Sequence, residues 1–128
     1  MGDVKKRPVN LNLFTIRFPV NALLSICHRL SGILLFLLLP FILYLFSLSV
    51  KSENSFISIS NALAEFFLLR FTIFIYVSAF SYHLFAGVRH LFMDLHLLDS
   101  KAKSINTAYL LILASASFIG YLAYIILL

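Results

Sequence analysis

Three long apolar runs constrain this chain more than any other feature of its sequence. Leu30–Val50 and Ile105–Leu128 contain no charged residue, and His83 alone interrupts Phe71–Val88. As helices these runs would be about 27–36 Å long, close to the roughly 30 Å thickness of a membrane's hydrocarbon layer. Buried helices of a small soluble domain rarely carry apolar runs of this length. We therefore predict an all-α membrane protein with three transmembrane helices.

The composition agrees with a lipid environment. Of the 128 residues, 62% are hydrophobic and 12% are charged, whereas soluble domains usually have about 25% charged residues. The net charge of +5 might suggest nucleic acid, but no Lys- and Arg-rich stripe with interleaved aromatic residues is present. The cations flank the apolar runs instead, as is usual in membrane proteins. We expect a lipid membrane around the chain and exclude nucleic acid as a partner.

The polar stretches between the apolar runs set the expected organisation. Residues 1–21 are interpreted as a retained segment at the membrane surface, because polar residues interrupt the short apolar core that a signal peptide needs. A three-span transmembrane domain follows at 22–128, with spans at about 22–50, 62–91 and 105–128. Pro40 lies inside the first span, where a membrane helix tolerates it. Residues 51–61 and 94–103 are expected to be polar connections.

Lysine and arginine are unequally divided between the two expected sides of the membrane. Most of the 10 cations lie in the N-terminal region through Arg29 or near the second connection. The opposite side holds only Lys51 and Arg70. The more basic side should face the cytoplasm or mitochondrial matrix. The N-terminus is therefore expected on that side and the C-terminus across the membrane.

A first polar cluster lies at the start of the first span. Ser25, His28, Arg29 and Gly32 are separated by three, four and seven residues, which places them on one helix face. A charge at the edge of the hydrocarbon is costly and generally faces protein or ligand. This cluster indicates a pocket for a molecule with oxygen acceptors. The alternative is that Arg29 extends to the membrane surface among polar capping neighbours.

A second polar cluster lies towards the end of the second span. His83, Gly87 and His90 share a helix face, with His83 about 8 Å inside the layer. A polar residue at that depth indicates function, and neutral imidazole is a common axial ligand of haem iron. The missing side chain of Gly87 would let a flat macrocycle or a neighbouring helix come close. The alternative role for His83 is a hydrogen bond between helices.

The remaining histidines do not provide a second axial ligand at the expected depth. The third span contains no histidine, and His28 is expected closer to the surface than His83. A second ligand would therefore come from another subunit. Arg89, His90 and Asp94 form a third group at the membrane edge. We interpret this group as a solvated helix end with an ion pair, and proton delivery to a nearby site is the alternative.

Three strings carry a family resemblance: R-P-V-N-L-N-L-F-T-I-R-F-P, S-I-C-H-R-L-S-G and Y-H-L-F-A-G-V-R-H-L-F-M-D. In order, spacing and three-span layout they resemble the cytochrome b membrane-anchor subunit of succinate dehydrogenase, respiratory complex II. The resemblance covers about Lys5–Asp94 closely. Beyond it, the third span agrees only in being apolar.

The resemblance implies a multi-subunit, haem-binding helical bundle in a bacterial or mitochondrial inner membrane. In this family a second small membrane-anchor subunit supplies the other axial ligand of a shared haem b. The anchor carries an iron–sulfur subunit and a flavoprotein subunit, and ubiquinone is reduced where it meets the iron–sulfur subunit. This subunit would shape the quinone-reducing site without touching succinate.

The resemblance also assigns residues. Ser25 and Arg29 match the quinone-site serine and arginine, and Ile26 and Phe18 match apolar walls of that pocket. His83 matches the axial ligand of the haem iron. The haem site would further include His28, Arg29 and Gly87. No catalytic residue of the dehydrogenase itself is expected in this chain.

Two other functions remain open from the sequence. One is a purely structural anchor without haem. The other is a small transporter or channel that uses His83.

Overall fold

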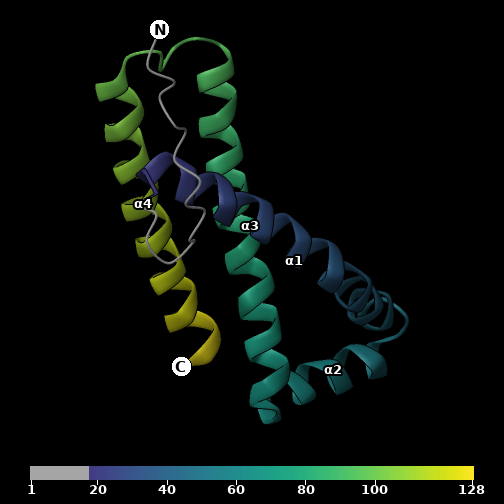
Figure 1. The fold of residues 1–128 in the computed structure, drawn as a ribbon. Coiled ribbons are helices and arrows are strands. Elements are labelled where there is room, and N and C mark those ends of the chain that lie inside the picture. Colours follow the sequence, from purple (N-terminus) through teal and green to yellow (C-terminus); the bar gives the residue numbers. More distant parts are fainter. Residues whose placement is uncertain (1–17) are drawn as a thin grey trace, which may run out of the picture.

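The computed structural model describes residues 18–128, and this part of the chain folds into four helices without a strand (Figure 1). The helices are α1 (Val20–Ser49), α2 (Glu53–Glu65), α3 (Phe67–Asp94) and α4 (Lys101–Leu127). Within this part, α1, α3 and α4 are long and apolar enough to cross a membrane. The prediction of an all-α membrane protein with three transmembrane helices is confirmed. The expected surface segment 1–21 lies mostly outside the described residues.

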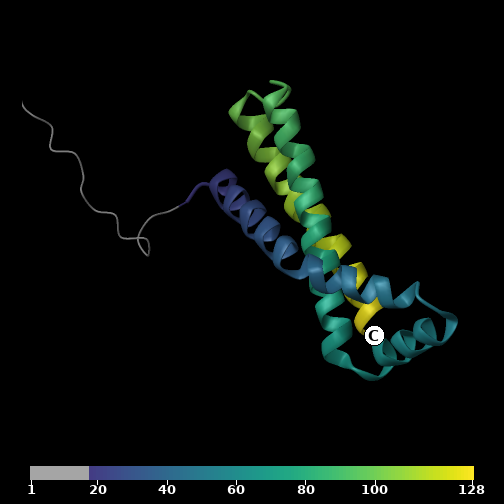
Figure 2. The ribbon, with the colours of Figure 1, turned by 90° about the vertical axis from the view of Figure 1, so that its right-hand side faces the viewer.

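Two of the three long helices form a tight pair, and the third diverges from them. α3 and α4 run antiparallel, side by side (Figure 1). α1 packs its N-terminal half against them and then crosses α3 obliquely, so that its C-terminal end stands apart (Figure 2). α1 continues through Pro40, as expected for a membrane helix with an internal proline.

Helix α2 is a feature that the sequence interpretation missed. The polar connection expected at 51–61 falls largely within α2. The Ser52 side chain caps this helix by accepting a hydrogen bond from the Ser55 amide at 3.1 Å. Its apolar residues Phe56, Ile59 and Leu63 recur at helical spacing and line a recess of about 420 Å³ between α1, α2 and α3. The helix is amphipathic, a property that is typical of helices lying along a membrane surface.

The second membrane helix is displaced from its expected bounds of 62–91. The chain turns at Phe66, whose backbone is extended, and α3 begins at Phe67. At the other end α3 continues to Asp94, and a left-handed residue, His96 (φ 59°), follows its C-cap. His83 therefore lies about 16 Å from the end of its helix, deeper than the sequence interpretation assumed.

The described part of the chain buries very little of itself. Its core consists of Leu24, Ala86, Ala108 and Leu111. Most of the residues buried on α3 and α4 are small, as is usual where membrane helices approach closely: Ser81, Ala86, Ser104, Ala108 and Ser115. On the outer face of α1, Phe36 is 75% exposed. This apolar face must be covered by lipid or by another subunit.

Candidate functional site

The site centres on two histidines that the crossing of α1 and α3 brings together. The imidazole ring of His28 on α1 stacks on that of His83 on α3, with centroids 4.0 Å apart and planes inclined by 17°. The ring of His90 lies 6.1 Å from that of His28. The sequence interpretation expected His28 nearer the surface than His83, and the structure places the two rings side by side where the helices cross. Stacking at this distance leaves no room for a macrocycle between the two rings.

The Nδ1 atom of His83 is held by α1. It lies 2.9 Å from Ser31 Oγ and 3.1 Å from the backbone carbonyl oxygen of His28. Ser31 Oγ donates its own proton to that same carbonyl at 2.7 Å. Nδ1 can therefore donate to an oxygen while Nε2 carries the lone pair. Among the residues that the structure describes, none makes a hydrogen bond to His83 Nε2.

Two glycines allow this close packing. A Cβ added at Gly32 would lie 3.1 Å from His83 Cε1, tighter than normal contact. A Cβ added at Gly87 would lie 3.6 Å from His28 Nε2, an ordinary contact distance. Gly32 thus lets α1 approach His83, while Gly87 faces His28.

Arg89 is buried at a junction of three helices, and the expectation of a solvated ion pair here is wrong. Its side chain is 9% exposed. Its Nη2 donates to Asn21 Oδ1 at 2.7 Å and to the Ser104 carbonyl at 2.8 Å, and its Nε donates to Thr107 Oγ1 at 3.3 Å. Asp94 is exposed, and the one ion pair within residues 18–128 joins His96 to Asp99.

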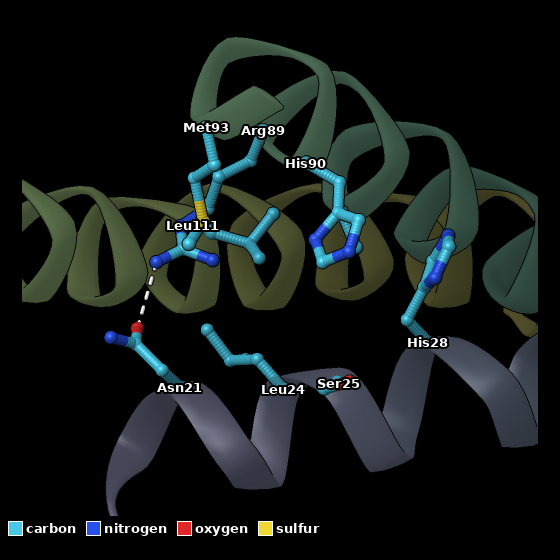
Figure 3. A pocket seen from close by; sticks show the side chains of 9 residues that line it. Asn21, Leu24, Ser25, His28, Arg89, His90, Met93 and Leu111 are labelled. Carbon is cyan, nitrogen blue, oxygen red and sulfur yellow. Dashed lines mark hydrogen bonds between the residues drawn. The ribbon is translucent and has the colours of Figure 1, made fainter. Parts of the chain in front are cut away.

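A small cavity, lined by both polar and apolar residues, lies between the histidines and this junction (Figure 3). Its volume is about 40 Å³, enough for a few water molecules and far too small for a quinone or haem. Asn21, Ser25 and His28 line it from α1, facing Arg89 and His90 of α3 (Figure 3). His28 Nε2 is buried here without a hydrogen-bond partner among the described residues, so a polar group from outside the described chain is needed to satisfy it.

The other predicted site residues lie outside this cavity. Arg29 is exposed, as are Ile26 at 42% and Phe18 at 40%. The structure therefore groups Ser25 with the histidines and leaves Arg29 on an open surface at the same end of α1. A larger ligand near Arg29 would need a wall from another subunit.

Sequence reasoning missed Ser31 and Asn21. Both are polar residues in the first half of a membrane helix, which is itself a signal. Their spacing from Ser25 and His28 also fits one side of α1. Only the positions of α3 and α4 reveal that Ser31 contacts His83 and that Asn21 contacts Arg89.

The donor set fits a haem better than a bare metal ion. Residues 18–128 contain no group of three or more His, Cys, Asp or Glu placed to hold an ion. A haem needs from this chain only one axial nitrogen. His83 meets this need, because an axial histidine typically donates its other ring nitrogen to a carbonyl or similar acceptor, as Nδ1 does here.

Comparison with known proteins gives one consistent result. Residues 3–123 match the model of the family described as succinate dehydrogenase/fumarate reductase transmembrane subunit. The succinate dehydrogenase cytochrome b556 subunit of Coxiella burnetii is 41% identical over 110 residues, covering 86% of this chain and 88% of the relative. The corresponding b556 subunit of Rickettsia bellii is 31% identical over 114 residues, covering 88% and 87%. The b560 subunit of Chondrus crispus is 32% identical over 114 residues, covering 85% and 88%.

Proposed function

This chain belongs to the succinate dehydrogenase/fumarate reductase transmembrane subunit family, and from that premise we propose that it binds haem b and forms part of the quinone-reducing site of a succinate dehydrogenase. The complex would oxidise succinate to fumarate and transfer the two electrons to ubiquinone. This subunit would not touch succinate. Its residues would shape the place where electrons leave the complex.

The hydrogen bonding of His83 carries the haem part of the proposal. Its Nδ1 is engaged by the His28 carbonyl and Ser31, which orients the ring and leaves Nε2 for iron. The unpartnered Nε2 of His28 offers a polar contact beside it, and Gly87 and Arg29 would lie around the same group. When bound, the haem supplies a one-electron store whose potential depends on axial ligation and burial.

A second axial ligand would come from another chain. His28 is stacked on His83 and cannot stand opposite it across a haem. His90 lies nearer the end of α3, and His96 lies beyond that end. A second small membrane-anchor subunit, packed against the exposed faces of α1 and α3, would supply it.

The quinone part of the proposal rests on Ser25 and Arg29. They lie one helical turn apart at the same end of α1. The Ser25 hydroxyl would donate a hydrogen bond to a quinone oxygen. The guanidinium of Arg29, being exposed, would be available to stabilise negative charge that develops on that oxygen during reduction. Ile26 and Phe18 present exposed apolar surface nearby, suited to a wall of the pocket.

The proposed location is a bacterial or mitochondrial inner membrane, with the N-terminus on the cytoplasmic or matrix side. The cation distribution supports this orientation. The iron–sulfur subunit would dock at the end of the molecule that holds Ser25 and Arg29, with the flavoprotein subunit beyond it. Electrons would then arrive beside those two side chains.

The test measures two activities on the same membranes: succinate to ubiquinone, and succinate to an artificial acceptor that takes electrons upstream. Ser25→Ala removes a neutral donor and should lower quinone reduction by up to about tenfold. Arg29→Leu should lower it further because a charged donor is lost. Arg29→Lys should restore it only in part, because an ammonium group cannot replace the guanidinium fork.

Artificial-acceptor activity should persist in all three variants. Unchanged quinone reduction in Arg29→Leu would show that the quinone assignment is wrong. Parallel loss of both activities, with release of the iron–sulfur and flavoprotein subunits, would make Arg29 an assembly residue instead. Absence of a haem band from the purified wild-type complex would favour the purely structural anchor. Conduction by the chain reconstituted alone would favour the transporter or channel.

A further inference from the structure

We infer that Arg89 is a positioning residue, which acts through Asn21 to hold the first turns of α1, and with them Ser25, in place. The inference rests on the proposed role of Ser25 in quinone binding. It concerns a buried contact between three helices rather than a group that touches the quinone.

The guanidinium of Arg89 is buried and forms its hydrogen bonds with protein groups. An arginine near a helix end normally extends its charged group to water. The side chain of Arg89 is instead 9% exposed, and its Nε and Nη2 atoms donate to Thr107, Asn21 and Ser104. A buried guanidinium is tolerated only when acceptors surround it. Within the described chain, those acceptors come from α1 and α4.

Asn21 is the point at which this junction holds α1. Its carbonyl oxygen accepts from Arg89 Nη2 at 2.7 Å, and its amide nitrogen donates to Ser104 Oγ at 2.9 Å. Asn21 is the second residue of α1, so both helices of the α3–α4 pair hold α1 at its end. Among residues 18–128, the Asn21–Ser104 contact is the only side-chain hydrogen bond between α1 and α4.

Ser25 lies between two such polar contacts along α1. Asn21 is one turn before it on the same face, and Ser31 contacts His83 further along. Beyond this region α1 diverges from α3 (Figure 2). Releasing Asn21 would leave the end of α1 attached to the rest of the bundle by the apolar packing of Leu24, by the His83 contacts and by the hydrogen bond from Tyr82 Oη to the Leu24 carbonyl. The position of Ser25 against its cavity would then be less well defined.

The experiment uses the complete complex and compares substitutions at Asn21. Asn21→Ala removes both hydrogen bonds, and Asn21→Asp keeps an acceptor for Arg89 while the Ser104 hydroxyl can donate to the carboxylate. Asn106→Ala is the matched control, because Asn106 is an exposed asparagine near the same end of α4. The readout is the KM for ubiquinone and kcat, with each preparation normalised to its artificial-acceptor activity.

Asn21→Ala should raise the KM for ubiquinone about two- to tenfold, because the loss is limited to the one hydrogen bond that Ser25 would make to the quinone, while kcat changes less. Asn21→Asp and Asn106→Ala should keep a KM near that of the wild type. A KM in Asn21→Ala equal to that of the control, or equal to that of Asn21→Asp, would overturn the inference. If Asn21→Ala does not assemble, Ser104→Ala is measured instead and judged by the same criterion. This variant removes the acceptor of the Asn21 amide and a longer contact of Arg89 Nη2 at 3.4 Å, and it keeps the Arg89–Asn21 hydrogen bond.

Measuring Ser25→Ala in parallel distinguishes a failure of the Arg89 inference from a failure of the proposed quinone assignment of Ser25. If Ser25→Ala raises the KM and Asn21→Ala does not, only the positioning role of Arg89 is wrong. If neither changes the KM, the quinone assignment of Ser25 is wrong and the inference fails with it.

Discussion

The imidazole of His28 lies flat against that of His83, with ring centroids 4.0 Å apart. This relationship joins the two polar clusters of the sequence into a single site at the crossing of α1 and α3. The two rings differ in their hydrogen bonds: His83 has a hydrogen-bonded Nδ1 and an Nε2 to which no described residue makes a hydrogen bond, whereas no described hydrogen bond is made by the ring of His28.

Replacing His83 should remove or alter an axial bond of the haem. In His83→Leu we expect a lost or shifted haem band in the reduced-minus-oxidised spectrum of the purified complex, because leucine provides no lone pair for iron. His96→Asn is the matched control. It also removes an imidazole, and asparagine tolerates the left-handed backbone of that position. An unchanged spectrum and haem potential in His83→Leu would show that the ligand lies elsewhere.

Removing the Ser31 hydroxyl should change the midpoint potential of the haem without releasing the haem. Ser31→Ala deletes the oxygen 2.9 Å from His83 Nδ1 but leaves the His28 carbonyl at 3.1 Å. A weaker acceptor at Nδ1 makes the imidazole a poorer donor to iron, which disfavours the ferric state. The midpoint potential should rise by about 20–60 mV, the equivalent of one hydrogen bond. Potentiometric titration of the haem band measures it, and a fall in potential would contradict the assignment.

Alanine substitutions at Gly32, Gly87 and Gly120 test how closely α1 and α3 approach each other around the two histidines. Gly32→Ala places a methyl group 3.1 Å from His83 Cε1, so the imidazole or α1 must shift and the haem spectrum should change. Gly120→Ala meets nothing within 4 Å among the residues that the structure describes and should leave the haem spectrum unchanged. Gly87→Ala meets His28 Nε2 at an ordinary 3.6 Å. A strong effect of Gly87→Ala on the haem would therefore report a group outside this chain. A normal spectrum in Gly32→Ala would contradict the tight approach of α1 to His83.

The orientation can be tested with single cysteines after Cys27→Ala. Lys51 and Lys103 are both exposed and lie at opposite ends of the long helices. Lys103→Cys should react with an impermeant thiol reagent from the cytoplasmic or matrix side, and Lys51→Cys from the other side. Labelling of both from one side would contradict the three-span topology.

The three spans were predictable because hydropathy and length suffice to place a membrane helix. The position of His28 beside His83 was not, since spacing along one helix gives a face and never the neighbour that the face meets. Arg89 illustrates the same difficulty, because a terminal arginine is normally solvated and only the α1–α4 contact buries it. α2 could have been found from the cap at Ser52 and the helical spacing of Phe56, Ile59 and Leu63. Its many serines and asparagines instead suggested a connection.

The small core affects the stability of this subunit in a cell before it assembles. With four buried apolar side chains in its described part, a newly inserted copy has little internal packing to hold α1 against the α3–α4 pair. Until its partners arrive, the polar groups on α1 are open to lipid or to any passing helix. Such a copy should be degraded faster than the assembled subunit, because cells remove poorly packed proteins with chaperones and proteases. The supply of partner subunits would then limit how much of this chain accumulates.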